Sequence, residues 1–328
     1  MESPLHNVLP TPFRQRLESI LPSDRFDPCW RTFYRPPATV FRVNLLKTDA
    51  ESLIPELHAA GLTPSPLPWN PEAFTVPDAQ RRSLTETDAC RQGRLYIQNP
   101  SSMVPPLVLD PAPDEWILDL TAAPGSKTLQ LAAMMGNRGK ISAVELVRSR
   151  FFRLRDNLTL GGATNVQTYL KDGSRVWRSC PEQFDRVLLD APCSSEGRFY
   201  TEDPKSFAYW SKKKIAEMSR KQKRLFYSAV QSLKPGGILV YSTCTFAPEE
   251  NELIVQRALQ QFPDALSIET IDLPLVDFQE GLAEWDGKDL HPELKKAARI
   301  LPDGLMEGFF ICKLRKLDST IDRSRNRS

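Results

Sequence analysis

The sequence predicts an α/β fold in which a parallel sheet wound with helices follows a smaller α+β module. From Trp116 onward, short apolar runs alternate with segments of helical period, which is typical of a buried parallel sheet covered by helices. Eighteen of the 28 prolines lie before Asp114, so long helices are not expected in the front third. Acidic side chains follow successive predicted strands, at the sheet edge where such folds bind ligands.

We divide the 328 residues into three parts. Residues 1–95 are expected to form the N-terminal module, 96–316 the domain that carries the sheet, and 317–328 a basic, disordered tail. In the module, alternating apolar residues predict strands at Val40–Asn44 and Leu95–Ile97 and a helix at Ala50–Ala60. With 41% hydrophobic and 26% charged residues, the chain can bury one large core, or a large and a small one.

In the larger domain, the elements follow from apolar runs and helical spacing. Five strands are predicted at Trp116–Leu120, Lys140–Glu145, Asn165–Tyr169, Arg186–Asp190 and Ile238–Tyr241. Helices are predicted around Phe151, Leu154 and Leu158, and from Ile215 to Ala229. Pro248, Glu249 and Glu250 suit the first turn of another helix. Loops are expected over 271–301, before a last strand at 308–314.

Several protein classes are excluded or disfavoured by composition. No run approaches the roughly 18 apolar residues of a membrane span, and Met1–Pro22 has no secretory pattern, which predicts a cytoplasmic protein without a membrane partner. The six cysteines show no C-x-x-C pair, so neither a zinc site nor a redox dithiol is predicted, and no metal is expected. The net charge of +2 is too small to indicate a nucleic-acid partner by itself.

A loop of small residues follows the first predicted strand and precedes a predicted helix. Such a loop lets a ligand approach the backbone and the positive end of the helix. Ser126 stands where a phosphate-binding P-loop needs glycine, and the dinucleotide motif G-x-G-x-x-G is absent, so a ligand other than a pyrophosphate is favoured. The loop residues are Thr121, Ala122, Ala123, Pro124, Gly125, Ser126 and Lys127.

Three carboxylates and two thiols complete the predicted site. Glu145, Asp172 and Asp190 follow the second, third and fourth strands, and Glu145 is placed to bind both hydroxyls of a ribose. Cys193 and Cys244 follow the fourth and fifth strands, so both thiols should emerge at the same crevice.

Paired thiols beside a nucleoside-binding crevice suit one reaction in particular. A thiolate that adds to carbon 6 of cytosine makes carbon 5 nucleophilic enough to accept a methyl group. Asp190 could stabilise the ring near nitrogen 3, and a second thiol could assist release of the enzyme. Spacing alone leaves open which of Cys193 and Cys244 attacks.

At these residues the sequence resembles the Sun-family RNA 5-methylcytosine methyltransferases, which include RsmB and RsmF. The resemblance covers most of the chain and is carried by short motifs: Phe41-Arg42-Val43-Asn44, Gln98-Asn99-Pro100-Ser101-Ser102-Met103, Ala-Ala-Pro-Gly-x-Lys, Asp190-Ala191-Pro192-Cys193-Ser194, Ser242-Thr243-Cys244-Thr245, Asn251-Glu252 and Gly308-Phe309-Phe310.

This resemblance implies a Rossmann-like S-adenosylmethionine-dependent methyltransferase sheet and an RNA-recognition-like N-terminal module. It implies that Cys244 is the nucleophile and Cys193 the release residue. It also implies that residues 121–127, Glu145, Asp172 and Asp190 line the S-adenosylmethionine site. The substrate would be a cytosine in rRNA or tRNA, and we expect a monomer.

Basic residues cluster on the predicted helix that leads back to the last parallel strand. Seven lie between Lys212 and Arg224, against one acid, Glu217, and suit either a solvated helix face or phosphate binding. Further arginines lie at 148–155 and in the tail, at Arg323, Arg325 and Arg327. The expected RNA contacts are Arg42, Lys212, Lys213, Lys214, Lys221 and Arg224.

Two alternatives remain open at this point. A DNA cytosine methyltransferase would attack with Cys193, the thiol after proline. A catalytically silent RNA-binding assembly factor would bind RNA without using either thiol.

Overall fold

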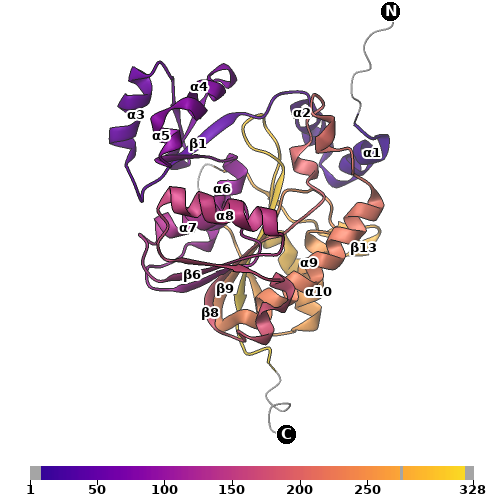
Figure 1. Ribbon diagram of the computed structural model, residues 1–328. Coiled ribbons are helices and arrows are strands. Elements are labelled where there is room, and N and C mark those ends of the chain that lie inside the picture. The colour runs from indigo at the N-terminus through magenta and orange to yellow at the C-terminus, as the bar shows by residue number, and fades with distance from the viewer. Residues whose placement is uncertain (1–8, 274–275, 322–328) are drawn as a thin grey trace, which may run out of the picture.

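The computed structural model describes residues 9–273 and 276–321 and contains two principal sheets. The larger has the strand order β11-β14-β15-β9-β8-β5-β6-β7, with β10 paired to β15. The predicted α/β fold is confirmed. Figure 1 shows this sheet at the centre of the molecule, with the N-terminal module to one side. The strands are β5 (Trp116–Asp119), β6 (Lys140–Glu145), β7 (Val166–Leu170), β8 (Phe184–Asp190), β9 (Leu233–Thr243), β10 (Leu266–Glu269), β11 (Gln279–Glu280), β14 (Ala298–Ile300) and β15 (Phe309–Lys316).

The five strands β5 to β9 run parallel, and β15 pairs antiparallel with β9. The chain passes from β5 outward to β6 and β7, and then returns to the other side of β5 with β8 and β9. The winding therefore reverses between β5 and β8. In open α/β sheets, ligands bind beyond the carboxyl ends of the strands at such a reversal.

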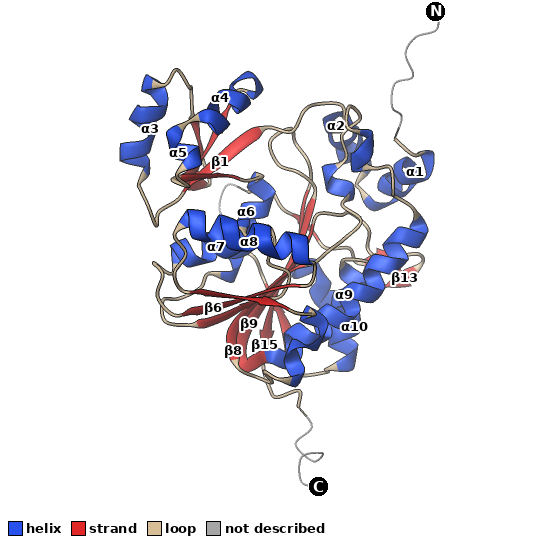
Figure 2. Ribbon diagram, in the orientation of Figure 1, coloured by secondary structure: helices blue, strands red, loops and turns tan. Residues whose placement is uncertain are grey.

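Helices cover both faces of this sheet, as Figure 2 shows. On one face, α6 and α7 place Val104 and Leu131 against Ile117 of β5. On the other face, α9 and α10 place Phe226 and Ile254 in the larger core cluster. The helices are α6 (Pro100–Leu109), α7 (Ser126–Met134), α8 (Arg148–Gly161), α9 (Lys212–Ser232) and α10 (Glu252–Gln261).

The N-terminal module is built on a four-stranded antiparallel sheet of order β2-β3-β1-β4. Phe41 and Val43 of the central strand pack with Leu53 and Leu57, which gives the module its own core. Its elements are β1 (Thr39–Val43), α3 (Ala50–Ala59), β2 (Ser65–Leu67), β3 (Asn70–Val76), α4 (Arg81–Glu86), α5 (Asp88–Arg91) and β4 (Leu95–Ile97).

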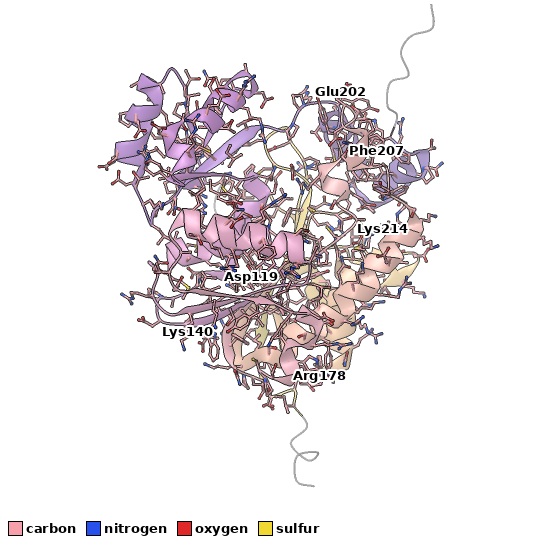
Figure 3. The ribbon with its side chains drawn as sticks, viewed as in Figure 1. Asp119, Lys140, Arg178, Glu202, Phe207 and Lys214 are labelled. Atoms are coloured by element: carbon pink, nitrogen blue, oxygen red, sulfur yellow. The ribbon has the colours of Figure 1, made fainter. Side chains whose placement is uncertain are left out.

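The first two helices, α1 (Thr11–Ile20) and α2 (Ser23–Thr32), lie apart from this sheet. Phe13 and Phe33 share an aromatic cluster with Phe199, Phe207 and Phe246, which belong to the segments that follow β8 and β9. Figure 3 shows Phe207 beside these helices. The beginning of the chain therefore supports the larger domain.

Two of the departures from the predicted elements follow β9. α10 begins at Glu252, so Glu250 lies in the turn before the helix rather than in its first turn, and it is fully buried. The region 271–301, expected as loops, contributes short strands, which include β12 (Glu284–Trp285) and β13 (Lys288–Asp289). The arginines Arg323, Arg325 and Arg327 lie outside the described residues. Within the described ranges, no helix is both long enough and apolar enough to span a membrane.

Candidate active site

A cavity of about 770 Å³ opens beyond the carboxyl ends of the parallel strands. The loops after β5, β6, β8 and β9 all contribute to its wall, together with the segment between β7 and the following 3₁₀ turn. The structure thus brings the sequence-predicted site residues into one space. Those that line it are Thr121, Ala122, Ala123, Pro124, Ser126, Lys127, Glu145, Asp172, Asp190, Cys193 and Cys244.

The loop after β5 is held from both sides by hydrogen bonds. Buried Asp119 accepts a hydrogen bond from Thr128 Oγ1 at 2.7 Å, which ties the strand to α7, and burial raises the pKa of Asp119 to about 6. Figure 3 labels Asp119 at the middle of the molecule. From α8, Asn157 Nδ2 donates to the Pro124 carbonyl at 2.8 Å. Gly125 has φ +107°, a conformation that disfavours other residues, and packs against Leu154 behind the loop.

Lys127 and Asp190 form an ion pair across the cavity. Lys127 Nζ lies 2.7 Å from Asp190 Oδ2 and also donates to Ser102 Oγ at 2.7 Å. The other oxygen of Asp190 accepts a hydrogen bond from Ser242 Oγ at 2.8 Å. Because both carboxylate oxygens are bonded, Asp190 is fixed beside the two thiols.

The other two predicted carboxylates lie at the ends of β6 and β7. Glu145 is buried, and its Oε1 accepts the Val147 amide at 2.8 Å. Asp172 caps the following 3₁₀ turn by accepting the Ser174 amide at 3.0 Å. The bonds fix the direction of each side chain, and both residues line the cavity.

The thiols of Cys193 and Cys244 are in direct contact, with 3.3 Å between their sulfur atoms. The pKa of Cys244 is lowered, chiefly by the hydrogen bond from Cys193 and then by the positive charge of Arg198. The pKa of Cys193 is raised by the same hydrogen bond and by burial. The pair therefore favours a thiolate on Cys244 and a neutral thiol on Cys193.

Two buried glutamates connect the cysteine loops, and sequence patterns did not identify either one. Glu250 accepts hydrogen bonds from the Ser194 amide at 3.0 Å and from Gln222 Nε2 at 2.9 Å. Glu196 accepts from Thr245 Oγ1 at 2.8 Å. Ser194 and Thr245, which adjoin the two cysteines, bond each other at 2.8 Å. Burial raises the pKa of Glu250 to about 8 and raises the pKa of Glu196.

The basic residues of α9 point in two directions. Lys221 and Arg224 line the large cavity, whereas Lys212 and Lys223 line a second hollow of about 360 Å³ with Arg16. Lys213 is exposed, and Lys214, labelled in Figure 3, pairs with Glu217.

Arg42 is located differently from the expectation of an RNA contact. Its side chain is fully buried in the N-terminal module, and burial lowers its pKa to about 10. Its side chain lies on the face of β1 opposite to Phe41 and Val43, and Ala73, its partner across the ladder, packs with Met103 of α6, so this second face of the sheet is covered as well. Arg42 is therefore not at the surface, where RNA would bind.

Among the residues that the structure describes, no group of three or more histidines, cysteines or acids is arranged to hold a metal ion.

Comparison with known proteins identifies the family. Residues 106–315 match the family described as 16S rRNA methyltransferase RsmB/F. The tRNA (cytosine(49)-C(5))-methyltransferase of Pyrococcus abyssi is 42% identical over 294 residues, which cover 88% of this chain and 91% of that protein. Ribosomal RNA small subunit methyltransferase F of Pectobacterium carotovorum is 35% identical over 95% of this chain, which spans 63% of the length of that relative.

A solved structure agrees with these relatives. The crystal structure of NSun6 from Pyrococcus horikoshii with SFG superposes with a TM-score of 0.82 at 25% identity, over 95% of this chain and 100% of that one. The chain therefore belongs to the RsmB/F family, and the predictions of a Sun-family RNA cytosine-C5 methyltransferase and of a Rossmann-like methyltransferase sheet are confirmed.

Proposed function

We propose that this protein methylates carbon 5 of a cytosine in tRNA or rRNA, with S-adenosylmethionine as methyl donor and a covalent adduct on Cys244. The observation that carries the proposal is the contact between two thiols of opposite pKa shift in a cavity lined by strand-end carboxylates. This contact suits an attacking thiolate on Cys244 and a neutral partner on Cys193.

The residues around the cavity fit S-adenosylmethionine, which supplies an electrophilic methyl group. Glu145 offers a carboxylate to the ribose hydroxyls, while the small side chains of residues 121–126 leave their backbone accessible. A Cβ at Gly173 would lie only 2.6 Å from the Leu120 carbonyl oxygen. Glycine is therefore the residue that fits at this part of the cavity wall. Asp172 and Lys127 add polar groups to the wall of the same cavity.

The roles of the reactive residues follow from their positions. Cys244 Sγ adds to carbon 6 of the cytosine, and carbon 5 then becomes the nucleophile that accepts the methyl group. Asp190, fixed by Lys127 and Ser242, interacts with the ring at nitrogen 3. After methylation, a base takes the proton from carbon 5, the electrons of that C–H bond restore the double bond to carbon 6, and the bond between carbon 6 and Sγ breaks. The neutral Cys193 assists by donating a hydrogen bond to the departing sulfur.

RNA would approach over α9, where Lys221 and Arg224 flank the cavity entrance. The cytosine must be unstacked or single-stranded to reach Cys244, which is only half buried. Lys212, Lys213 and Lys214 extend the basic surface along the same helix and would contact more distant phosphates.

The roles of the two cysteines can be tested by trapping the adduct. Cys193→Ala should accumulate a covalent complex with labelled tRNA in the presence of S-adenosylmethionine, visible on denaturing gels, because addition proceeds and release is blocked. Cys244→Ala should form no complex. tRNA is the first substrate to test because the tRNA methyltransferase relative matches over almost its whole length.

Two outcomes would contradict the proposal. An adduct that persists in Cys244→Ala would assign the attack to Cys193, as in the DNA-enzyme alternative. A wild-type protein that shows no heat of binding with S-adenosylmethionine in calorimetric titration would favour the silent assembly factor.

A further inference from the structure

Ser195 is a third side chain in contact with the two thiols. The Cys244 thiol donates to Ser195 Oγ at 3.6 Å, and Ser195 Oγ lies 3.9 Å from Cys193 Sγ. With the 3.3 Å between the sulfur atoms, these contacts form a closed triangle. Ser195 also lines the cavity in which the reaction is proposed to occur, so its hydroxyl is adjacent to the attacking atom.

The backbone at Ser195 has an unfavourable conformation for a residue with a side chain. Its φ of 60° and ψ of 29° lie in the left-handed region, which glycine adopts freely and serine rarely does. The residue is the N-cap of a short 3₁₀ turn, and its side chain makes no capping hydrogen bond there. Neither the backbone conformation nor a capping hydrogen bond therefore accounts for a serine at this position. The contacts of its side chain in the described structure include the two sulfur atoms.

We propose that Ser195 is a further catalytic residue whose hydroxyl stabilises the ionised sulfur of Cys244 before it attacks the base. This inference rests on the proposed role of Cys244 as nucleophile. A hydroxyl group can accept a hydrogen bond from a neutral thiol and, after rotation, donate one to a thiolate. Hydrogen bonds to a charged group are the stronger ones, so the exchange favours the ionised sulfur. Ser195 itself forms no covalent bond in this step.

Other groups also act on Cys244, and a test must separate Ser195 from them. Cys193 and Arg198 favour its ionised form, while the negative charge of Asp190 and burial oppose it. Of these groups, Arg198 is exposed and lies 3.5 Å from Glu307. Substitutions at Ser195 leave the side chains of Cys193, Arg198 and Asp190 in place, so a change in Cys244 reactivity can be assigned to the hydroxyl.

Two substitutions at Ser195 separate the effect of its hydroxyl from the effect of its backbone conformation. Ser195→Ala removes the hydroxyl and retains the Cβ, whereas Ser195→Gly removes both and suits the positive φ. We expect both variants to transfer methyl groups about tenfold more slowly, the size of effect expected for one hydrogen bond to a charged group. We expect both to shift the pH midpoint for alkylation of Cys244 by iodoacetamide upward, measured on the Cys244 peptide by mass spectrometry.

Thermal unfolding supplies the complementary measurement. Ser195→Gly should raise Tm although it lowers the rate, because it relieves the left-handed backbone. Asp264→Gly is the matched control: Asp264 has φ 63° and is exposed, so its replacement should raise Tm and leave both the methylation rate and Cys244 alkylation unchanged.

The proposal is overturned if Ser195→Ala and Ser195→Gly both keep the wild-type methylation rate and alkylation midpoint. It is equally overturned if the rate falls while the midpoint stays unchanged, since the hydroxyl would then act on something other than the thiolate. If the wild-type protein fails to methylate RNA, the proposed function fails, and the alkylation midpoints still report whether Ser195 acts on Cys244.

Discussion

The two halves of the large cavity are held in place by different kinds of interaction. In the half formed by residues 121–126, the wall is a short loop whose backbone carbonyls accept individual hydrogen bonds, such as that from Asn157 to the Pro124 carbonyl. In the half formed by the two cysteine loops, Glu196, Glu250 and Glu252 are buried and bonded to residues distant in sequence. The first half suits a ligand that binds and leaves, and the second fixes reacting atoms.

This difference implies different responses to mutation. A buried charge that loses its partner is costly, so a substitution that leaves one unpaired in the cysteine half should reduce the stability of the whole domain. An exposed hydrogen bond contributes little to stability, so damage to the loop half should mainly affect ligand binding. The following substitutions test this contrast from the largest expected effect to the smallest.

The largest effect is expected at the ion pair between Arg299 and Glu252. Arg299 Nε lies 2.7 Å from Glu252 Oε1, both side chains are buried, and Arg299 Nη1 also donates to the Phe246 carbonyl beside the Cys244 loop. Glu252→Gln should lower the free energy of unfolding by about 3–5 kcal/mol, because it leaves the buried guanidinium without its counter-charge. Urea unfolding followed by circular dichroism measures this loss.

The exposed pair between Arg82 and Glu86 provides the control. Glu86→Gln should change the free energy of unfolding by less than about 1 kcal/mol. Equal losses in the two variants would show that burial does not distinguish the two pairs.

The next effect is a pH dependence at Glu250. Its pKa in the folded protein is about 8, raised mainly by burial, so between its ordinary value and pH 8 the folded protein retains a proton that the unfolded chain loses. This group therefore makes stability fall as pH rises through that range. Glu250→Gln, which mimics the protonated form, should gain stability relative to wild type by a few kcal/mol between pH 5 and pH 9.

The neighbouring Glu249→Gln serves as a control for Glu250. Glu249 pairs with Arg16 at 2.7 Å nearer the surface, and its replacement should alter stability by about 1 kcal/mol or less across the same pH range. If Glu250→Gln instead lost stability relative to wild type toward pH 9, the folded protein would contain the ionised carboxylate.

The same contrast explains how much the sequence could predict. The loop residues, Glu145 and Asp172 follow predicted strands directly, so the parallel sheet alone places them together. Glu250 was predicted in the first turn of a helix, and its contacts with Ser194 and Gln222, 56 and 28 residues away in the chain, hold it in the interior. Arg42 was misplaced for a related reason, since its charge suggested a surface position, and the packing of Ala73, its cross-strand partner, with Met103 of α6 shows that this face of β1 is covered.

A smaller effect on stability is expected in the loop half. Asn157→Ala removes the hydrogen bond to the Pro124 carbonyl and should lower the free energy of unfolding by about 1 kcal/mol. It should nevertheless weaken S-adenosylmethionine binding, because the loop loses a support on the side away from the cavity. Calorimetric titration of folded protein measures the affinity.

Asn165→Ala is the matched control for Asn157, because Asn165 Nδ2 donates to the Arg138 carbonyl at the same 2.8 Å, at the amino end of the sheet. It should show a similar loss of stability and unchanged affinity. If both variants weakened S-adenosylmethionine binding equally, the loop half would not depend on its own local bonds.

The smallest effect concerns the two directions of α9. Lys221 lines the large cavity and Lys223 lines the smaller hollow, although they are two residues apart on one helix. Lys221→Ala should weaken RNA binding severalfold and reduce the slope of log affinity against log salt by about 1, as expected for a lost phosphate contact. Lys223→Ala should change the affinity and the salt slope less, because it removes the same charge from the side of α9 that lines the smaller hollow. Equal losses in fluorescence anisotropy titrations with tRNA would mean that the RNA backbone spans both hollows rather than following the cavity that contains the cysteines.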